Sequence, residues 1–296
     1  MYGVKQLFVP ATVKEALEWL HQNPQAKVIA GGTDLLLKMR NQAMREVVLV
    51  SLHKLKELEG IEILPDGTLR IGAMVTFTQV NRSSLVREKL PFLAEAAVTM
   101  GGPQIQNVAT IGGNLCNGAV SADSAPSLLA LEARLVLENR EGTREVSLED
   151  FYLGPGRVDL KEDELLTAIK IPLPRHNKWG GYYYKYSMRR AMDISTLGCA
   201  VVCAVEAGGQ VSQARIALGT AAPTPIRCRQ AEALVAGRFL SPDLLIRIGE
   251  TAAGEAKPRS SWRASKEFRL ELIKELTART LVQAYQNAGG EYRDEN

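Results

Sequence analysis

Residues 27–40 read KVIAGGTDLLLKMR, an apolar run followed by two glycines, a threonine, an aspartate and a second apolar run. The first run predicts a short buried strand at 27–30, and residues 34–42 could begin a helix or continue as an extended segment. Paired glycines let the backbone approach a ligand, because they have no Cβ. Consecutive free N–H groups in such a turn bind anions. The pattern is neither G-x-G-x-x-G nor a Walker loop, so neither of these phosphate loops explains it.

A second turn of the same kind, TIGGN at 110–114, is followed nine residues later by Asp123. The threonine and asparagine side chains of the two turns can add hydrogen-bond donors. Two such loops suit a pyrophosphate held from both sides, and the alternative is two tight turns that serve only the fold. Asp34 and Asp123 have the wrong charge for contact with phosphate. We therefore expect them to fix the loop backbone or to bind ribose or ribityl hydroxyls.

Helix and strand patterns alternate around these loops without a regular repeat. Thr12 and Glu15 form a capping-box pattern at the start of a helix over 12–21, and Asp66-Gly67 predicts the turn of a hairpin over 61–75. This mixture favours an α+β fold over a parallel doubly wound sheet. The other predicted elements are a strand at 46–52, a helical stretch at 84–100 interrupted at Pro91, a hairpin at 134–148, a linker at 171–181, strands at about 198–206 and 210–219, and a last helix at about 266–287 that ends at Gly289-Gly290.

Length and composition are those of an ordinary globular protein of about two domains. The chain has 296 residues, of which 46% are hydrophobic and 23% charged, and its net charge is +3. That charge is too weak to indicate nucleic acid or an anionic membrane as a partner. No apolar stretch approaches the roughly 18 residues of a spanning helix, and the N-terminus lacks the layout of a signal peptide. We therefore expect a cytoplasmic protein.

The chain's own side chains offer little catalytic chemistry. Its four cysteines, Cys116, Cys199, Cys203 and Cys228, lack metal-site spacing and predict small buried thiols. The three histidines are scattered, and no G-x-S-x-G occurs, so we expect neither a metal site nor a catalytic triad. Loops for a dinucleotide without acid–base residues indicate that a bound cofactor supplies the chemistry.

The stretch YYYKYSMRRAMDIS at 182–195 is the other unusual feature. Three tyrosines precede Lys185, and the pair Arg189-Arg190 precedes Asp193. One interpretation is an ordinary tyrosine-rich strand with a solvated edge. The other is a cationic, aromatic strand and loop that face a bound cofactor and a second, anionic substrate.

Several of these stretches resemble one family, the FAD-binding (medium) subunits of molybdenum hydroxylases, and most of all those of bacterial xanthine dehydrogenases. The resemblance covers about residues 1–290. It rests on AGGTDLL (30–36), NVATIGGNLCN (107–117), SADSAP (121–126), KYSMRRAMDIS (185–195), GTAAPTPIRC (219–228) and SSWRASKEFR (260–269).

The resemblance implies an α+β fold in two domains. Residues 1–176 would form an FAD-binding domain of the vanillyl-alcohol oxidase (PCMH) type with two subdomains. Residues 177–290 would form a smaller α+β domain with an antiparallel sheet, as in carbon monoxide dehydrogenase flavoproteins, and 291–296 would be a tail.

The resemblance also implies how non-covalent FAD would be bound. The first loop would wrap the pyrophosphate, and the second would form a phosphate and flavin loop. Asp123 would bond the ribityl or phosphate region, while Leu165 and Lys185 would close the site near the adenine and the flavin edge. No metal ligand or catalytic residue is implied, because flavin N5 carries the hydride. The implied cofactor-binding residues are Val28, Ile29, Ala30, Gly31, Gly32, Thr33, Asp34, Leu35, Thr110, Ile111, Gly112, Gly113, Asn114, Asp123, Leu165 and Lys185.

Two positions depart from the family pattern. Met100 stands where some relatives place an aromatic ring against the flavin, and Met192-Asp193 stands where eukaryotic relatives have paired acids. Flavin stacking and the approach of NAD⁺ are therefore the features that the resemblance leaves open.

The implied function is electron transfer within a complex. Xanthine or hypoxanthine would be hydroxylated at a molybdenum centre on a large partner subunit, and electrons would pass through [2Fe–2S] clusters on a small partner subunit to FAD here and then to NAD⁺. Lys185 and the arginine pair are hypothesised to stabilise reduced, anionic flavin. The alternatives are the same role in a carbon monoxide, nicotinate, aldehyde or aromatic-substrate hydroxylase, or a nucleotide-binding module without redox activity.

Overall fold

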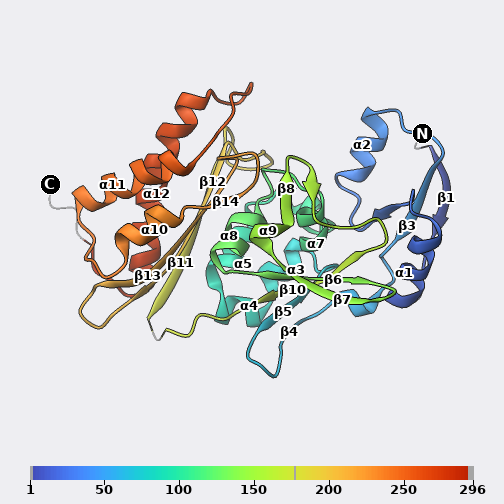
Figure 1. Ribbon diagram of the computed structural model, residues 1–296, viewed down its shortest axis with the longest axis horizontal. Coiled ribbons are helices and arrows are strands. Elements are labelled where there is room, and N and C mark those ends of the chain that lie inside the picture. Colours follow the sequence, from blue (N-terminus) through green and yellow to red (C-terminus); the bar gives the residue numbers. More distant parts are fainter. Residues whose placement is uncertain (1–2, 177, 293–296) are drawn as a thin grey trace.

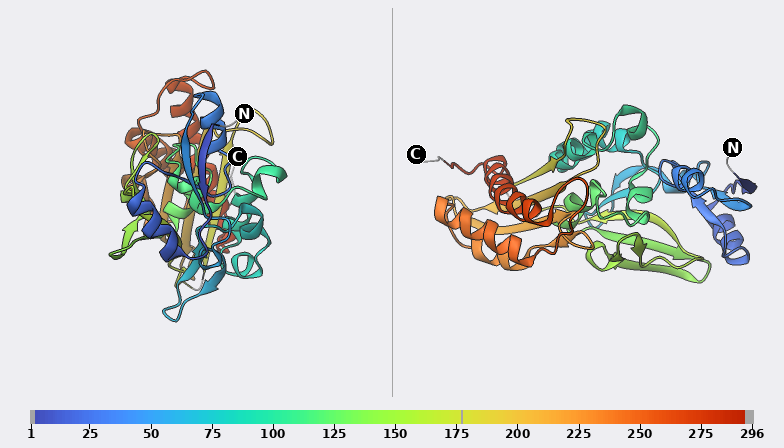
Figure 2. Two further views of the ribbon diagram at one scale, coloured as in Figure 1. Left: turned by 90° about the vertical axis from the view of Figure 1, so that its right-hand side faces the viewer. Right: turned by 90° about the horizontal axis from the view of Figure 1, so that it is seen from above.

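A computed structural model of the chain describes residues 3–176 and 178–292. It has three parts that follow one another along the long axis, with the N-terminal part at one end and the C-terminal helices at the other (Figures 1 and 2). The predicted domain boundary at 177 and the tail beyond 292 fall outside the described residues.

The first part is a small parallel sheet with two helices. Its strands lie in the order β1-β3-β2, with β3 parallel to both neighbours. Helix α1 buries an apolar face, and Thr12 caps it by accepting a bond from the N–H of Glu15. The second bond of the predicted capping box is wrong, because the Glu15 carboxylate accepts from the N–H of Ala11 and not from that of Thr12. The elements are β1 (Val4–Phe8), α1 (Val13–Gln22), β2 (Lys27–Ile29), α2 (Leu35–Asn41) and β3 (Val47–Ser51).

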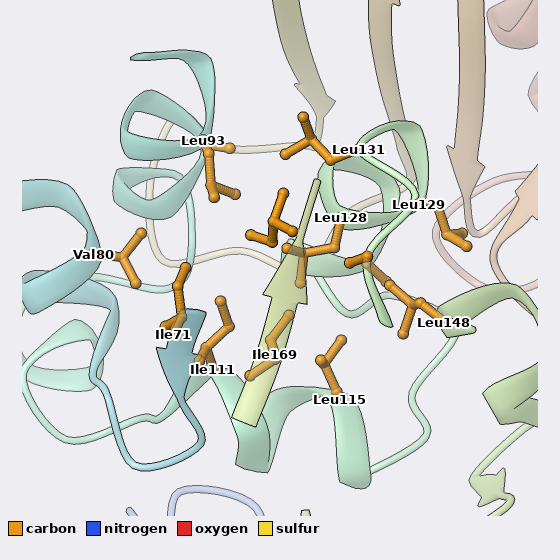
Figure 3. Packing of buried hydrophobic residues seen from close by; sticks show 14 of the residues in the cluster. Ile71, Val80, Leu93, Ile111, Leu115, Leu128, Leu129, Leu131, Leu148 and Ile169 are labelled. Atoms are coloured by element: carbon orange, nitrogen blue, oxygen red, sulfur yellow. The ribbon is translucent and has the colours of Figure 1, made fainter. Parts of the chain in front are cut away.

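The second part is an antiparallel sheet in the order β4-β5-β10-β6-β7, covered by short helices. Figure 3 shows Ile169 of the central strand β10 packed with Ile111 and Leu115 of α7. Both predicted hairpins are present, and Pro91 begins a new helix, as a residue without an N–H can. The elements are η1 (Lys56–Leu58), β4 (Ile61–Ile63), β5 (Leu69–Gly72), α3 (Phe77–Arg82), α4 (Ser84–Lys89), α5 (Pro91–Val98), α6 (Pro103–Gln106), α7 (Ile111–Cys116), α8 (Ser124–Ala130), β6 (Arg134–Asn139), β7 (Gly142–Ser147), α9 (Leu148–Phe151), β8 (Tyr152–Gly154), β9 (Arg157–Val158) and β10 (Leu165–Ile171).

The third part is an antiparallel sheet whose strands pair in chain order. Strand β12 is buried at every position, since one face lies under the C-terminal helices and the other packs on the second part (Figure 1). The predicted linker is shorter than expected, because β10 continues to Ile171 and β11 begins at Trp179. The elements are β11 (Trp179–Tyr186), β12 (Leu197–Val205), β13 (Val211–Gly219), β14 (Ile226–Arg227), α10 (Arg229–Val235), α11 (Pro242–Glu255) and α12 (Lys266–Asn287).

Candidate functional site

A cleft of about 620 Å³ lies where the three parts meet, within the usual size range of ligand sites. Both glycine loops line it, together with the start of β10 and part of the loop at 187–195. Of the predicted site residues, Ile29, Ile111 and Lys185 do not reach the lining. Those that do are Val28, Ala30, Gly31, Gly32, Thr33, Asp34, Leu35, Thr110, Gly112, Gly113, Asn114, Asp123 and Leu165.

The first glycine loop presents a row of open donors. Gly32 adopts the left-handed conformation, with φ +74°, and the loop leads directly into α2. The backbone N–H groups of residues 31–34 donate to no group within the described part of the chain. Asp34 is exposed and its carboxylate does not cap α2, which leaves it free to meet hydroxyl groups of a ligand. The first loop therefore has the donor pattern of an anion site.

The second glycine loop uses its donors internally, contrary to the expectation that the two loops would act alike. The N–H groups of Ile111 and Gly112 donate to the carbonyls of Val75 and Ala73 at 2.9 and 3.0 Å. That of Gly113 donates to the Thr110 hydroxyl, which caps α7. Because these N–H groups are used, the loop can contact a ligand through side chains, Cα surfaces and the N–H of Thr110, which donates to no group in the described part of the chain.

Asn114 supplies the polar side chain of that second loop. Its Oδ1 accepts a bond from the Ser124 hydroxyl at 2.7 Å. This fixes the orientation of the amide, so that Nδ2 remains as a donor beside the cleft.

Close packing explains two of the glycines. A Cβ on Gly31 would lie 1.9 Å from the carbonyl oxygen of Val108, and one on Gly112 would lie 2.6 Å from that of Ala73. The first loop thus rests on the backbone that leads into the second loop. These glycines are required for contact between protein segments, so ligand approach is not their only reason.

Asp123 is the centre of a buried polar network behind the cleft. Its Oδ2 pairs with Lys185 Nζ at 2.8 Å, and its Oδ1 accepts from the hydroxyls of Ser195 at 2.8 Å and Tyr183 at 3.3 Å. Lys185 also donates to the carbonyl of Thr99. Burial raises the pKa of Asp123, while the Lys185 charge opposes that rise. Burial and the Asp123 carboxylate raise the pKa of Tyr183.

This network changes the expected role of Lys185. Its ammonium group is buried and paired with Asp123, so the side chain acts on the cleft through that carboxylate. Sequence reasoning missed Tyr183 and Ser195. Tyr183 could have been found from its spacing to Lys185, because residues two apart on a strand lie on the same face.

The loop at 187–195 forms one rim of the cleft through Met192, Asp193 and Ile194. Met192 is left-handed, with φ +54°, and its N–H donates to the carbonyl of Gly101. The Asp193 carboxylate accepts from the backbone N–H of Arg189 and forms an ion pair with its guanidinium. Met100, one of the two positions that depart from the family pattern, is buried against the same cleft.

A partly buried clasp, of which Glu164 is the buried member, positions Leu165 at the opposite side of the cleft. Arg144 donates to both oxygens of Glu164, at 2.7 and 2.8 Å, and to Asp159 Oδ2 at 2.7 Å. Burial opposes ionisation of Glu164, yet the hydrogen bonds from Arg144 and from the Lys161 N–H, together with the charges of both residues, outweigh it and lower the pKa of Glu164. The clasp holds the segment that brings Leu160 and Leu165 to the cleft.

Other reactive groups do not gather at the cleft. Within residues 3–176 and 178–292, no three His, Cys, Asp or Glu side chains cluster as metal ligands would. Cys116 lines the cleft, but burial raises the pKa of its thiol to about 12. None of the helices in the described part has the length and apolar character needed to cross a bilayer.

Comparison with known proteins identifies the family of the chain. Residues 3–174 match the family model of the FAD-binding domain in molybdopterin dehydrogenase, and residues 182–284 match the C-terminal domain of the carbon monoxide dehydrogenase flavoprotein. The chain belongs to this family of FAD-binding molybdenum hydroxylase subunits. The family's expected fold, an FAD-binding domain followed by a domain with an antiparallel sheet, is confirmed.

Relatives within this family align over most of their length. The xanthine dehydrogenase FAD-binding subunit of Escherichia coli O157:H7 is 46% identical over 95% of this chain and 96% of its own. The nicotinate dehydrogenase FAD-subunit of Eubacterium barkeri is 34% identical over 81% of this chain and 82% of its own. Among solved structures, a carbon monoxide dehydrogenase chain from Hydrogenophaga pseudoflava superposes with a TM-score of 0.92 and 32% identity, over 97% and 99% of the two chains.

The cleft's donor set fits FAD. The open N–H groups at 31–34 suit a diphosphate, and Asp34 suits the hydroxyls of a ribose. The apolar side chains Met100, Ile105 and Leu165 provide surface for flat rings. Neither glycine loop contains a histidine that could hold flavin covalently.

Proposed function

We propose that this chain is the FAD-carrying electron-transfer subunit of a xanthine dehydrogenase-type molybdenum hydroxylase. The observation that carries the proposal is the 46% identity to a xanthine dehydrogenase FAD-binding subunit over nearly the full length of both chains. The E. barkeri nicotinate dehydrogenase relative, at 34%, keeps nicotinate as the second candidate substrate of the complex.

In this proposal the FAD-binding residues are those expected from the sequence, with roles adjusted to their positions. The N–H groups at 31–34 hold the diphosphate, and Asn114 Nδ2 donates from the second loop. Ile29 and Ile111 support the two loops from behind, and Lys185 acts by holding Asp123. We also propose that residues 1–176 and 177–290 are the two domains of the subunit.

When bound, FAD accepts electrons singly and passes them on as a hydride. The chain's own residues bind and orient it. The buried Asp123 network fixes the wall between the two domains, and the loop at 187–195 limits access of water at the rim. Arg189 and Arg190 are exposed beside that rim, where they suit the phosphates of NAD⁺ as the electron acceptor.

The proposed partners are a large molybdenum subunit and a small [2Fe–2S] subunit, which oxidise hypoxanthine and xanthine in the cytoplasm. Purification of the tagged chain with its natural partners tests this. A yellow complex whose flavin is reduced by xanthine and by NADH is the expected result. Reduction by nicotinate alone would reassign the substrate, and a colourless chain that takes up no FAD would leave a nucleotide-binding module without redox activity.

A further inference from the structure

The side chains that line the cleft carry an unbalanced set of charges. Three are carboxylates: Asp34, Asp123 and Asp193. Asp123 has Lys185 as its counter-ion and Asp193 has Arg189, and neither of these cations reaches the lining. Among the described residues that line the cleft, Lys38 is the one cation.

Lys38 keeps its charge available. Its Nζ donates to Asn117 Oδ1 at 2.6 Å, and this partner is a neutral amide. It forms no ion pair with a carboxylate in the described part of the chain. Lys185, by contrast, has its charge matched by Asp123. A cation without a counter-ion at the edge of a binding cleft is suited to an anionic ligand.

Lys38 and its partner Asn117 each lie four residues after a glycine-loop residue, Asp34 in the first loop and Gly113 in the second. The carbonyl of Gly113 accepts the Asn117 N–H. Residues four apart on a helix are neighbours at about 5–6 Å. The bond from Lys38 to Asn117 therefore joins α2 to the end of α7 one helical turn beyond the two loops.

We propose that Lys38 is the counter-charge for the diphosphate of FAD, and that its bond to Asn117 holds this charge over the gap between the two loops. This inference rests on the proposed binding of FAD in the cleft. It adds what the loops lack, because backbone N–H groups carry partial charges only and the exposed Asp34 carboxylate repels phosphate. A full positive charge at this position also raises the affinity for dinucleotides, which carry a diphosphate, above that for uncharged flavins.

The test uses the full chain freed of flavin, with FAD titrated by fluorescence and ADP as a competitor. We expect Lys38→Met to raise the Kd for FAD and for ADP about ten- to hundredfold, which is the range of a lost charge-assisted hydrogen bond. It should also weaken the salt dependence of binding. Lys38→Arg should restore most of the affinity, and Asn117→Ala should give a smaller loss.

Arg40→Met is the matched control. Arg40 is exposed on the same helix and outside the cleft lining, and its replacement changes the net charge by the same amount. Equal FAD affinity and salt dependence for the Lys38→Met and Arg40→Met variants would overturn the proposal. So would a loss of FAD affinity without any loss for ADP. If the unmodified chain binds no FAD, the proposed function itself fails, which is a separate result. Thermal unfolding of each variant without ligand shows whether the fold is intact.

Discussion

The pair of Asp123 and Lys185 shows how one buried contact links the cleft to the second domain. Removing either partner leaves the other charge buried, which costs about 3–5 kcal/mol in the free energy of unfolding. We expect Lys185→Met and Asp123→Asn each to destabilise the protein by about this amount. The double variant should be more stable than the sum of the two losses predicts. Urea unfolding of the four proteins measures the coupling, and additive losses would show that the pair does not interact.

Lys185→Met also tests the hypothesis that this residue stabilises reduced flavin. Because its ammonium is held by Asp123 and lies outside the lining, any effect passes through the Asp123 carboxylate. Under the hypothesis the flavin potential falls in the variant. A potential equal to that of the unmodified protein in a redox titration would refute it.

Replacement by alanine should have opposite effects at Gly31 and at Gly254, because only Gly31 is in close contact with another segment. In Gly31→Ala the new Cβ meets the Val108 carbonyl at 1.9 Å, so the first loop must move away from the second and FAD should be lost. Gly254 lies in α11 with nothing within 4 Å of a Cβ. Gly254→Ala should raise the free energy of unfolding by up to about 1 kcal/mol, because alanine favours a helix. Flavin content and thermal unfolding of the two variants check both statements, and a yellow Gly31→Ala protein would contradict the first.

The segment before β10 depends on the Arg144 clasp, and this dependence should vary with pH. The pKa of Glu164 is lower in the folded protein than its ordinary value of 4.5. The stabilisation is therefore fully present above pH 4.5 and is lost as the pH falls through the folded pKa. Glu164→Gln should cost about 1.5–3 kcal/mol at neutral pH and make unfolding less sensitive to acid. Glu141→Gln, at an exposed position, is the control that changes the net charge by the same amount. The same acid sensitivity in the Glu164→Gln variant and the unmodified protein would exclude the clasp as its source.

Elements with local signals were predictable from the sequence, and contacts between distant segments were not. Pro91 divided a helical stretch because it cannot donate to the preceding turn, and Gly67 has the positive φ that its turn requires. The different use of the two glycine loops depends on Ala73 and Val75, which are far from either motif in sequence. The Asp123 network likewise joins residues 60 or more positions apart. No local pattern encodes such pairings.

At the scale of the whole molecule, the C-terminal sheet completes the core of the FAD-binding domain. Tyr183, Ala200, Val202 and Ala217 of that sheet belong to the same hydrophobic cluster as helices α5 and α8. A Cβ on Gly181 would lie 2.4 Å from the Phe92 ring, so strand and helix are in close contact. The two domains are thus expected to fold together.

The last prediction follows from this shared core. A chain ending at the proposed boundary, residue 176, would expose the apolar face of α5 and α8 and leave Asp123 without Lys185, Tyr183 and Ser195. We expect this fragment to aggregate and to bind no FAD, although it contains both glycine loops. Expression of residues 177–296 as a separate chain in the same cells should restore solubility and flavin, because it supplies the missing face and cation. Gel filtration and flavin absorbance decide the outcome. A soluble fragment 1–176 that binds FAD as tightly as the full chain would show that the C-terminal domain does not shape the cleft.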